Sequence, residues 1–114
     1  MNLVICLMLT LAILSPPPEI TGTIVDTNGK LVSRIPISVV AITSDRVIKR
    51  TVSESNGSFH FTGLAPGGYG VVANTGSACA ISEAIRVDIG FTKVVRLRLT
   101  KGLCQNPIHF ANHP

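Results

Sequence analysis

The chain has 114 residues, which is enough for one domain and too few for two. Its composition is 46% hydrophobic and 14% charged, which excludes a disordered chain and disfavours an enzyme with a deep cleft. Ten Lys and Arg residues against six Asp and Glu residues give a net charge of +4, which permits weak attraction to anionic polymers or membrane surfaces without identifying one.

The first fifteen residues differ from the rest. Leu3 to Leu14 is a run of twelve uncharged and nearly all apolar residues, followed by a serine and three prolines. A bilayer span needs about 20 apolar residues, whereas the core of a secretory signal peptide has about 7–15. We therefore predict a signal peptide over 1–15, a proline linker over 16–18, and a secreted or periplasmic (extracytoplasmic) protein. A short uncleaved anchor and a misplaced start codon are the alternatives, because no Lys or Arg precedes the run.

From Glu19 onward, apolar and polar residues alternate with a period of two, which is the pattern of β-strands. Short clusters rich in Gly, Pro, Asn, Asp and Ser separate these stretches, as at Asn28-Gly29. No stretch after residue 15 sustains a helical apolar stripe. The pattern predicts seven strands, over 20–26, 37–43, 46–53, 58–61, 69–74, 81–89 and 93–100.

Seven short strands separated by frequent turns predict an all-β fold. We expect a seven-stranded antiparallel Greek-key β-sandwich over 19–101, followed by a C-terminal tail over 102–114. In the sixth strand, alternate side chains are expected to face the core and the solvent. The inward residues would be Ile81, Ile85, Val87 and Ile89, and the outward ones Ser82, Ala84, Arg86 and Asp88.

Two stretches of this pattern resemble the carboxypeptidase regulatory-like domain family. Residues 22–29 (GTIVDTNG) are similar to its G-x-V-x-D-x-x-G opening, and residues 51–69 (TVSESNGSFHFTGLAPGGY) to its T-x-T-D-x-x-G-x-F-x-F-x-x-L-x-P-G-x-Y core. The last strand, rich in Val and Leu, also fits. The resemblance covers about 19–100 and implies a transthyretin-like, carbohydrate-binding-like fold. The departures are Leu31 in place of proline, Glu54 in place of aspartate, and Ile35-Pro36 in place of Gly-Ala.

The motif residues have structural roles in this interpretation. Gly57 supplies a turn conformation that a side chain would strain, and the aromatic and leucine positions are spaced to fill one core. None of them forms a site for chemistry. The residues of the motif are Asp26, Gly29, Gly57, Phe59, Phe61, Leu64, Pro66, Gly67 and Tyr69.

Candidate catalytic and metal-binding residues are few. The six acidic residues are scattered, no Gly-x-Ser-x-Gly turn occurs, and no Gly-rich loop precedes a helix. His109 and His113 lie four residues apart in the tail, and His60 is expected to face outward from a strand, which together make a weak metal candidate. We therefore expect that the protein is not an enzyme and needs no cofactor and no metal.

Cysteine usage agrees with export. Cys6 lies in the predicted signal peptide, which leaves Cys79 and Cys104 in the mature chain. An even pair in a small exported domain indicates a disulfide. The sixth and seventh strands are expected to pair antiparallel through the turn at 90–92, which would place both cysteines at the same end of the sandwich. Two unpaired thiols are the alternative.

Basic residues gather on the last two predicted strands. Arg86, Arg96 and Arg98 face outward in this pattern and form a candidate patch for an anionic ligand. Protection of edge strands against aggregation explains the same charges equally well. No nucleic-acid partner is expected, because the sequence has neither a recognition helix nor aromatic stacking residues.

The sequence favours an exported, non-catalytic module with a structural or interaction role and a protein or glycan partner at the cell surface. No membrane span is expected after cleavage of the signal. The alternative is a carbohydrate-binding module that recognises a cell-surface or extracellular glycan. Since sugar sites usually carry exposed Trp or Tyr rings, this alternative depends on whether Tyr69, which is expected in the core, is instead exposed.

Overall fold

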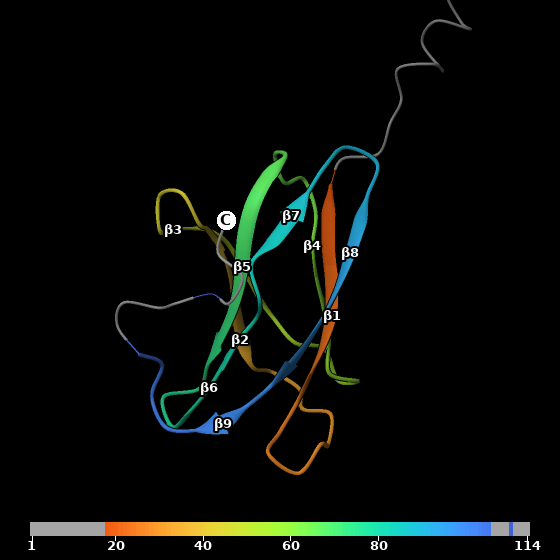
Figure 1. Cartoon of the computed structure of the whole chain (residues 1–114). Helices are drawn as coiled ribbons and strands as arrows, with labels where there is room; N and C mark the ends of the chain where they lie inside the picture. The colour runs from red at the N-terminus through yellow and green to blue at the C-terminus, as the bar shows by residue number, and fades with distance from the viewer. Residues whose placement is uncertain (1–17, 106–109, 111–114) are drawn as a thin grey trace, which may run out of the picture.

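The strands of this chain form two sheets that face each other (Figure 1). A computed structural model describes residues 18–105 and Phe110, and this part contains strands and turns but no helix. Its nine strands are β1 (Glu19–Val25), β2 (Pro36–Ala41), β3 (Arg46–Val52), β4 (Ser58–Phe61), β5 (Gly67–Asn74), β6 (Ala78–Ile81), β7 (Ile85–Val87), β8 (Thr92–Arg98) and β9 (Thr100–Lys101). The order is β4-β1-β8 in the three-stranded sheet and β3-β2-β5-β6-β9, with β7 beside β5, in the six-stranded sheet. The all-β prediction is confirmed, and two facing sheets agree with a β-sandwich, whereas the predicted number of seven strands is wrong.

The pairing of β1 departs from the predicted antiparallel arrangement. β1 pairs antiparallel with β4 but parallel with β8, and the β1–β8 ladder holds seven consecutive residue pairs. Ile20 and Ile24 of β1 and Val95 and Leu97 of β8 are buried in the same core. The period of two therefore gives β1 and β8 their core faces correctly, but it does not determine which strand lies beside them.

The predicted sixth strand is broken into β6 and β7 by Ser82. Ser82 is only 8% exposed, and its hydroxyl accepts the N–H of Val71 (2.9 Å) and donates to the carbonyl of Glu83 (2.7 Å). The side chain thus takes part in the hydrogen bonding between strands, and it interrupts the regular ladder after β6. Val87 faces the core as predicted, whereas Ile89, predicted to face inward, is 60% exposed in the turn before β8.

The predicted seventh strand is also divided, because the chain changes sheets at Leu99. β8 ends beside β1 in the three-stranded sheet, and β9 pairs with β6 in the six-stranded sheet. Leu99 is buried between them, and its N–H donates to the carbonyl of Val25 (2.9 Å). A single residue therefore connects the edge strands of the two sheets.

The main core lies between the sheets. Phe59 and Phe61 of β4 are buried in it with their rings 6.1 Å apart, edge to face, while His60 between them is exposed. This arrangement confirms the predicted register of the strand. Gly22 permits the packing, since a Cβ at this position would lie 2.2 Å from the carbonyl oxygen of Val95 and 2.5 Å from the Phe59 ring. The largest fully buried side chains of the core are Ile20, Ile24, Ile37, Val39, Val71 and Val87.

A second, smaller apolar cluster lies on the outer face of the six-stranded sheet. It consists of Val40, Ile42, Val72 and Phe110. The Phe110 ring packs directly on Gly70, because a Cβ on Gly70 would lie 2.1–2.4 Å from three carbons of the ring. Phe110 of the predicted C-terminal tail is therefore part of the folded domain, and Cys104 of the same tail packs against this cluster.

Cys79 and Cys104 form the predicted disulfide, with their Cα atoms 5.1 Å apart. The expected hairpin does not bring them together, because β7 and β8 belong to different sheets. Instead β6 pairs with β9, Cys79 lies opposite Thr100, and the N–H of Gly102 donates to the carbonyl of Ser77 (2.9 Å). Closing a loop with a sequence separation of 25 stabilises the fold by roughly 3 kcal/mol.

Candidate functional site

One edge of the three-stranded sheet is open. β8 is the last strand on that side, and no other strand of the described part pairs with its outer edge. The N–H of Glu19 donates to the carbonyl of Phe91 (3.3 Å), and the N–H of Leu99 donates to the carbonyl of Val25 (2.9 Å). Because backbone groups point to alternate sides along a strand, the odd-numbered residues of β8 bond to β1. The residues whose N–H and C=O groups point to the open edge are therefore Thr92, Val94, Arg96 and Arg98.

The side chains of β8 also alternate, between the core and the outer face of the sheet. Val95 and Leu97 are buried, whereas Arg96 and Arg98 are exposed and Val94 is 73% exposed. The exposed apolar side chain of Val94 thus lies on the same face of β8 as the guanidinium groups of Arg96 and Arg98. The same residues carry the free backbone groups, so the edge presents hydrogen-bonding groups and positive charge together.

The outer face beside β8 is shallowly hollowed. A depression of about 480 Å³ is bounded by Arg96 and Arg98 and by Thr23 and Val25 of the neighbouring strand. The Arg98 side chain donates to the carbonyl of Thr27 (2.9 Å), which holds this guanidinium near the turn that follows β1. Positive charge therefore lies along one border of an otherwise uncharged depression.

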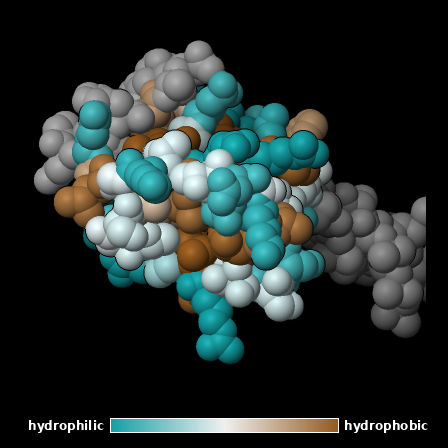
Figure 2. Space-filling model, turned by 90° about the horizontal axis from the view of Figure 1, so that it is seen from below, coloured by the Kyte–Doolittle hydropathy of each residue, from teal (hydrophilic) through white to brown (hydrophobic). Residues whose placement is uncertain are grey.

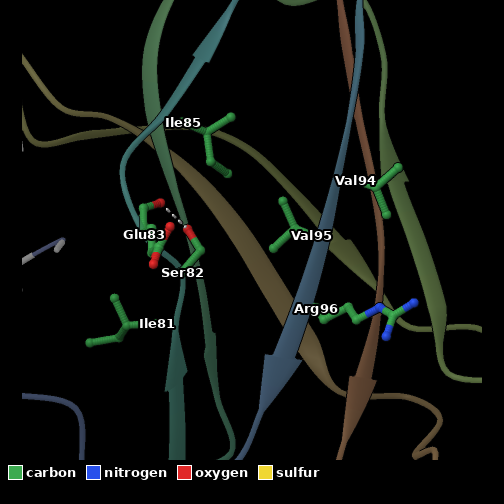
Figure 3. Close-up of a pocket in the computed structure, with 7 residues that line it drawn as sticks. All are labelled: Ile81, Ser82, Glu83, Ile85, Val94, Val95 and Arg96. Carbon is green, nitrogen blue, oxygen red and sulfur yellow. Dashed lines mark hydrogen bonds between the residues drawn. The ribbon is translucent and has the colours of Figure 1, made fainter. Parts of the chain in front are cut away.

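A second hollow, a groove of about 310 Å³, runs between β8 and the six-stranded sheet (Figure 3). In Figure 3 the side chain of Val95 points across the groove toward Ile85, whereas the side chain of Arg96 lies on the opposite side of β8. Glu83 adds a carboxylate to the far wall. The groove is lined by Ile81, Ser82, Glu83, Ile85, Val94, Val95 and Arg96.

Other exposed apolar side chains lie on β3, in the turn before β8 and singly elsewhere. Seen from below, apolar side chains reach the surface in small areas between hydrophilic ones (Figure 2). Single exposed apolar residues are ordinary on protein surfaces. The β8 edge differs from the edge of β3, which also carries basic residues and borders a hollow, because the pairing register of β8 is unbroken. The large exposed apolar residues of the described part are Leu31, Val47, Ile48, Val52, Ile89, Phe91, Val94 and Leu103.

The three arginines of the predicted patch lie on two different sheets. Arg96 and Arg98 share the outer face of β8. Arg86 is on β7, opposite Gly68 of β5 in the six-stranded sheet, and its neighbour Val87 faces the core. The structure therefore brings Arg96 and Arg98 together and places Arg86 elsewhere, because the predicted hairpin that would have aligned them does not form.

Neither Val94 nor the groove is predicted from the sequence. Val94 is an apolar residue at an outward position of a strand whose other outward residues are basic, and this break in the alternation was the available signal. The groove had no such signal, since its two walls come from strands that are predicted to be hydrogen-bonded neighbours and instead belong to separate sheets.

The sequence model of the carboxypeptidase regulatory-like domain matches residues 19–100 of this chain. The chain belongs to this family. No curated protein matches it significantly. The matched region begins at the first residue of β1 and ends at the first residue of β9, so this carboxypeptidase regulatory-like domain includes both sheets and the β8 edge.

The polar motif residues of this carboxypeptidase regulatory-like domain form turns. The Asp26 carboxylate accepts the N–H groups of Lys30 (3.0 Å) and Asn28 (2.8 Å). These bonds, with that of Lys30 the stronger influence, lower the pKa of Asp26 from its ordinary value because they favour the ionised form. Gly29 and Gly57 have φ angles of 83° and 76°, which other residues adopt only with strain.

The apolar motif residues lie in the core. Phe59, Phe61, Leu64 and Tyr69 are all buried, and Pro66-Gly67 leads the chain into β5. Tyr69 is 6% exposed, and its hydroxyl donates to the carbonyl of Ala65. Its ring is therefore not available to stack on a sugar, and the carbohydrate-binding alternative has no support from this residue.

Two further findings concern metals and membranes. Within residues 18–105 and 110, no group of three or more His, Cys, Asp and Glu side chains is arranged to hold a metal ion. His60 lies on β4, whereas His109 and His113 fall outside the described residues. The part of the chain that the structure describes also has no helix that is long and apolar enough to cross a membrane, and the predicted signal peptide over 1–15 lies outside that part.

Proposed function

We propose that this carboxypeptidase regulatory-like domain is an exported, non-catalytic module that acts by binding a partner through its surface. The observation that carries the proposal is the Cys79–Cys104 disulfide. Disulfides form and persist in oxidising compartments, and they are common in small exported domains with limited cores. The apolar run from Leu3 to Leu14 supports the same route as a signal peptide.

The surface that supports binding best is the β8 edge. It lies within the family match, and it offers free backbone groups, exposed arginines and two adjacent hollows. Binding proteins commonly use such open strands to pair with an extended segment of another chain. The motif residues, in contrast, are occupied in turns and in the core, so they support the scaffold rather than the interaction.

The test is the fate of the complete chain in a host that exports proteins. We expect a mature product outside the cytoplasm that begins near Pro16 and has no free thiol at Cys79 or Cys104. Intact-mass analysis with alkylation before and after reduction measures both properties. A Cys79→Ser, Cys104→Ser double variant is the matched control for the thiol count. A cytoplasmic product that retains Met1 and carries two alkylated thiols at these positions would overturn the proposal.

A further inference from the structure

We propose that the β8 edge binds an extended acidic segment of a partner protein, which joins the three-stranded sheet as an additional strand. This inference rests on the proposed role as an interaction module, and it names the surface and the chemistry of the partner. The regularity of the edge, its open backbone groups, its charge and the adjacent groove each define one property of that segment.

The regularity of β8 distinguishes it from the other edge strands of the described part. β3 is equally long, but its pairing with β2 shifts after Val39↔Lys49 to Val40↔Val47, which leaves Ile48 out of register. Such bulges disturb an edge and discourage further pairing. β4 has four residues, β7 three and β9 two, whereas β8 has seven residues in one unbroken register. An added strand would find its longest regular template at β8.

The open backbone groups of β8 provide affinity without regard to sequence. The N–H and C=O groups of four alternate residues, from Thr92 to Arg98, point to the open side. An extended segment laid beside them would bond to these groups in the repeat of a β-ladder. Val94 and Arg96 are central in this row, so their amide hydrogens would be the ones most strongly protected by a bound strand.

The charge of the outer face selects an acidic segment over a second copy of this chain. If two copies of β8 paired antiparallel, the outward residues of each strand would face those of the other, and Arg96 and Arg98 would lie among like charges. Like charges directly opposite across a strand pair are destabilising, and opposite charges are favourable. Asp or Glu at the outward positions of the incoming strand would instead lie beside the two guanidinium groups.

The groove determines which side chains are favoured on the inner face of the incoming strand. An additional strand beside β8 would direct alternate side chains over the space lined by Ile81, Ile85 and Val95. Aliphatic side chains would bury apolar area there, whereas carboxylates would lie near Glu83 and be repelled. The partner segment is therefore one in which acidic residues alternate with aliphatic residues.

A set of three synthetic peptides tests this pattern with the exported, disulfide-bonded protein. The first is acetyl-Glu-Val-Glu-Thr-Glu-Val-Glu-amide, the second has the same composition in the order Glu-Val-Val-Thr-Glu-Glu-Glu, which places one Val on each face of the strand, and the third has Lys in place of each Glu. We expect saturable binding of the first peptide in calorimetry at low salt. The reordered peptide should bind at least about tenfold more weakly, and the Lys peptide should not bind. Binding requires both the alternation of acidic and aliphatic side chains along the strand and a negative charge opposite the arginines.

Two pairs of variants locate the binding on the protein. Arg96→Glu should lower the affinity for the first peptide by at least about tenfold, since it replaces an attraction by a repulsion. Arg86→Glu, on the other sheet, should change this affinity less than about twofold. Val94→Pro removes an N–H that faces the open edge rather than β1, so it should abolish binding, whereas Val94→Thr keeps the N–H and should bind. Circular dichroism verifies that each variant retains its fold.

Hydrogen exchange separates strand addition from simple attraction between charges. The amides of Val94 and Arg96 should exchange faster than those of Val95 and Leu97 in the free protein and become protected when the first peptide binds. Equal binding of the ordered and reordered peptides, equal binding by Arg96→Glu and the wild type, or binding without protection of these two amides would each overturn the inference. Such a result with an exported, oxidised chain leaves the proposed function standing, whereas a reduced cytoplasmic chain overturns the proposed function itself.

Discussion

The outer faces of the two sheets differ in composition and in what covers them. On the six-stranded sheet, Val40, Ile42 and Val72 form an apolar area that Phe110 covers, and Gly70 leaves the room for its ring. On the three-stranded sheet, the outer face carries threonines and arginines beside an open edge. One face is thus closed by Phe110 of the chain's own predicted C-terminal tail, and the other is left to solvent or to a partner. This difference separates positions where substitutions should affect stability from positions where they should affect binding.

The largest expected effects are at the inner side of β4. Phe59→Ala and Phe61→Ala should each destabilise the fold by about 3–5 kcal/mol, because each empties an aromatic core site. His60→Ala, on the outer side of the same strand, should cost less than about 0.5 kcal/mol. Urea midpoints of the three variants measure the contrast. A similar loss at His60 would mean that this outer face is covered rather than open.

A smaller effect tests the covered face of the six-stranded sheet. Gly70→Ala should destabilise by about 1–3 kcal/mol, because its Cβ would overlap the Phe110 ring. Gly68→Ala on the same strand is the matched control, since a Cβ there has no atom within 4 Å, and its cost should stay within about 0.5 kcal/mol.

The dependence on Phe110 is tested by a double-mutant cycle with Phe110→Ala. In that background Gly70→Ala should cost much less than in the wild type, because the ring that conflicts with the new methyl group is gone. Chemical denaturation of the four proteins gives the coupling energy. If Gly70→Ala costs the same with and without the ring, Phe110 does not cover this face in solution.

The smallest effect concerns the turn after β1. The pKa of Asp26 is lowered in the folded protein, so its ionised form stabilises the fold above the unfolded pKa of about 3.9, and this contribution is lost as the pH falls through the folded pKa. Asp26→Asn keeps an acceptor oxygen but removes the charge. The free energy of unfolding of Asp26→Asn should therefore fall less steeply than that of the wild type as the pH drops below about 4.

Denaturation midpoints between pH 2 and pH 7 compare the two proteins at this turn. Identical acid profiles for Asp26→Asn and the wild type would show that the bonds from Lys30 and Asn28 do not persist in solution.

Local sequence patterns predicted much of the scaffold. The alternation in β4 placed Phe59 and Phe61 inside and His60 outside. The motifs also indicated the family, over about the same residues, 19–100, that the family model matches. These features depend on neighbours within a strand or a turn, where the period of two and the chemistry of Gly and Asn act directly.

The partners of each strand could not be predicted in the same way. The parallel pairing of β1 with β8 joins residues more than 70 positions apart, and alternation is satisfied equally well by an antiparallel neighbour. Ser82 fits an outward strand position by its polarity, yet its hydroxyl bonds to Val71 and breaks the strand. The candidate site was affected most, because Arg86 on β7 and Arg96 on β8 lie in different sheets instead of in the predicted hairpin.

The parallel arrangement of β1 and β8 has a mechanical consequence. β1 begins close to Pro18 and β8 ends close to Leu99, so tension applied along the chain at these two points would pull the strands in opposite directions along their common axis. The hydrogen bonds of all seven residue pairs would then be loaded in shear at the same time, rather than breaking one after another. The disulfide joins Cys79 and Cys104 on either side of β8, so the segment that contains β8 cannot be fully extended under tension. We expect the domain to resist stretching most strongly along this axis, and force spectroscopy with handles at these ends would measure it.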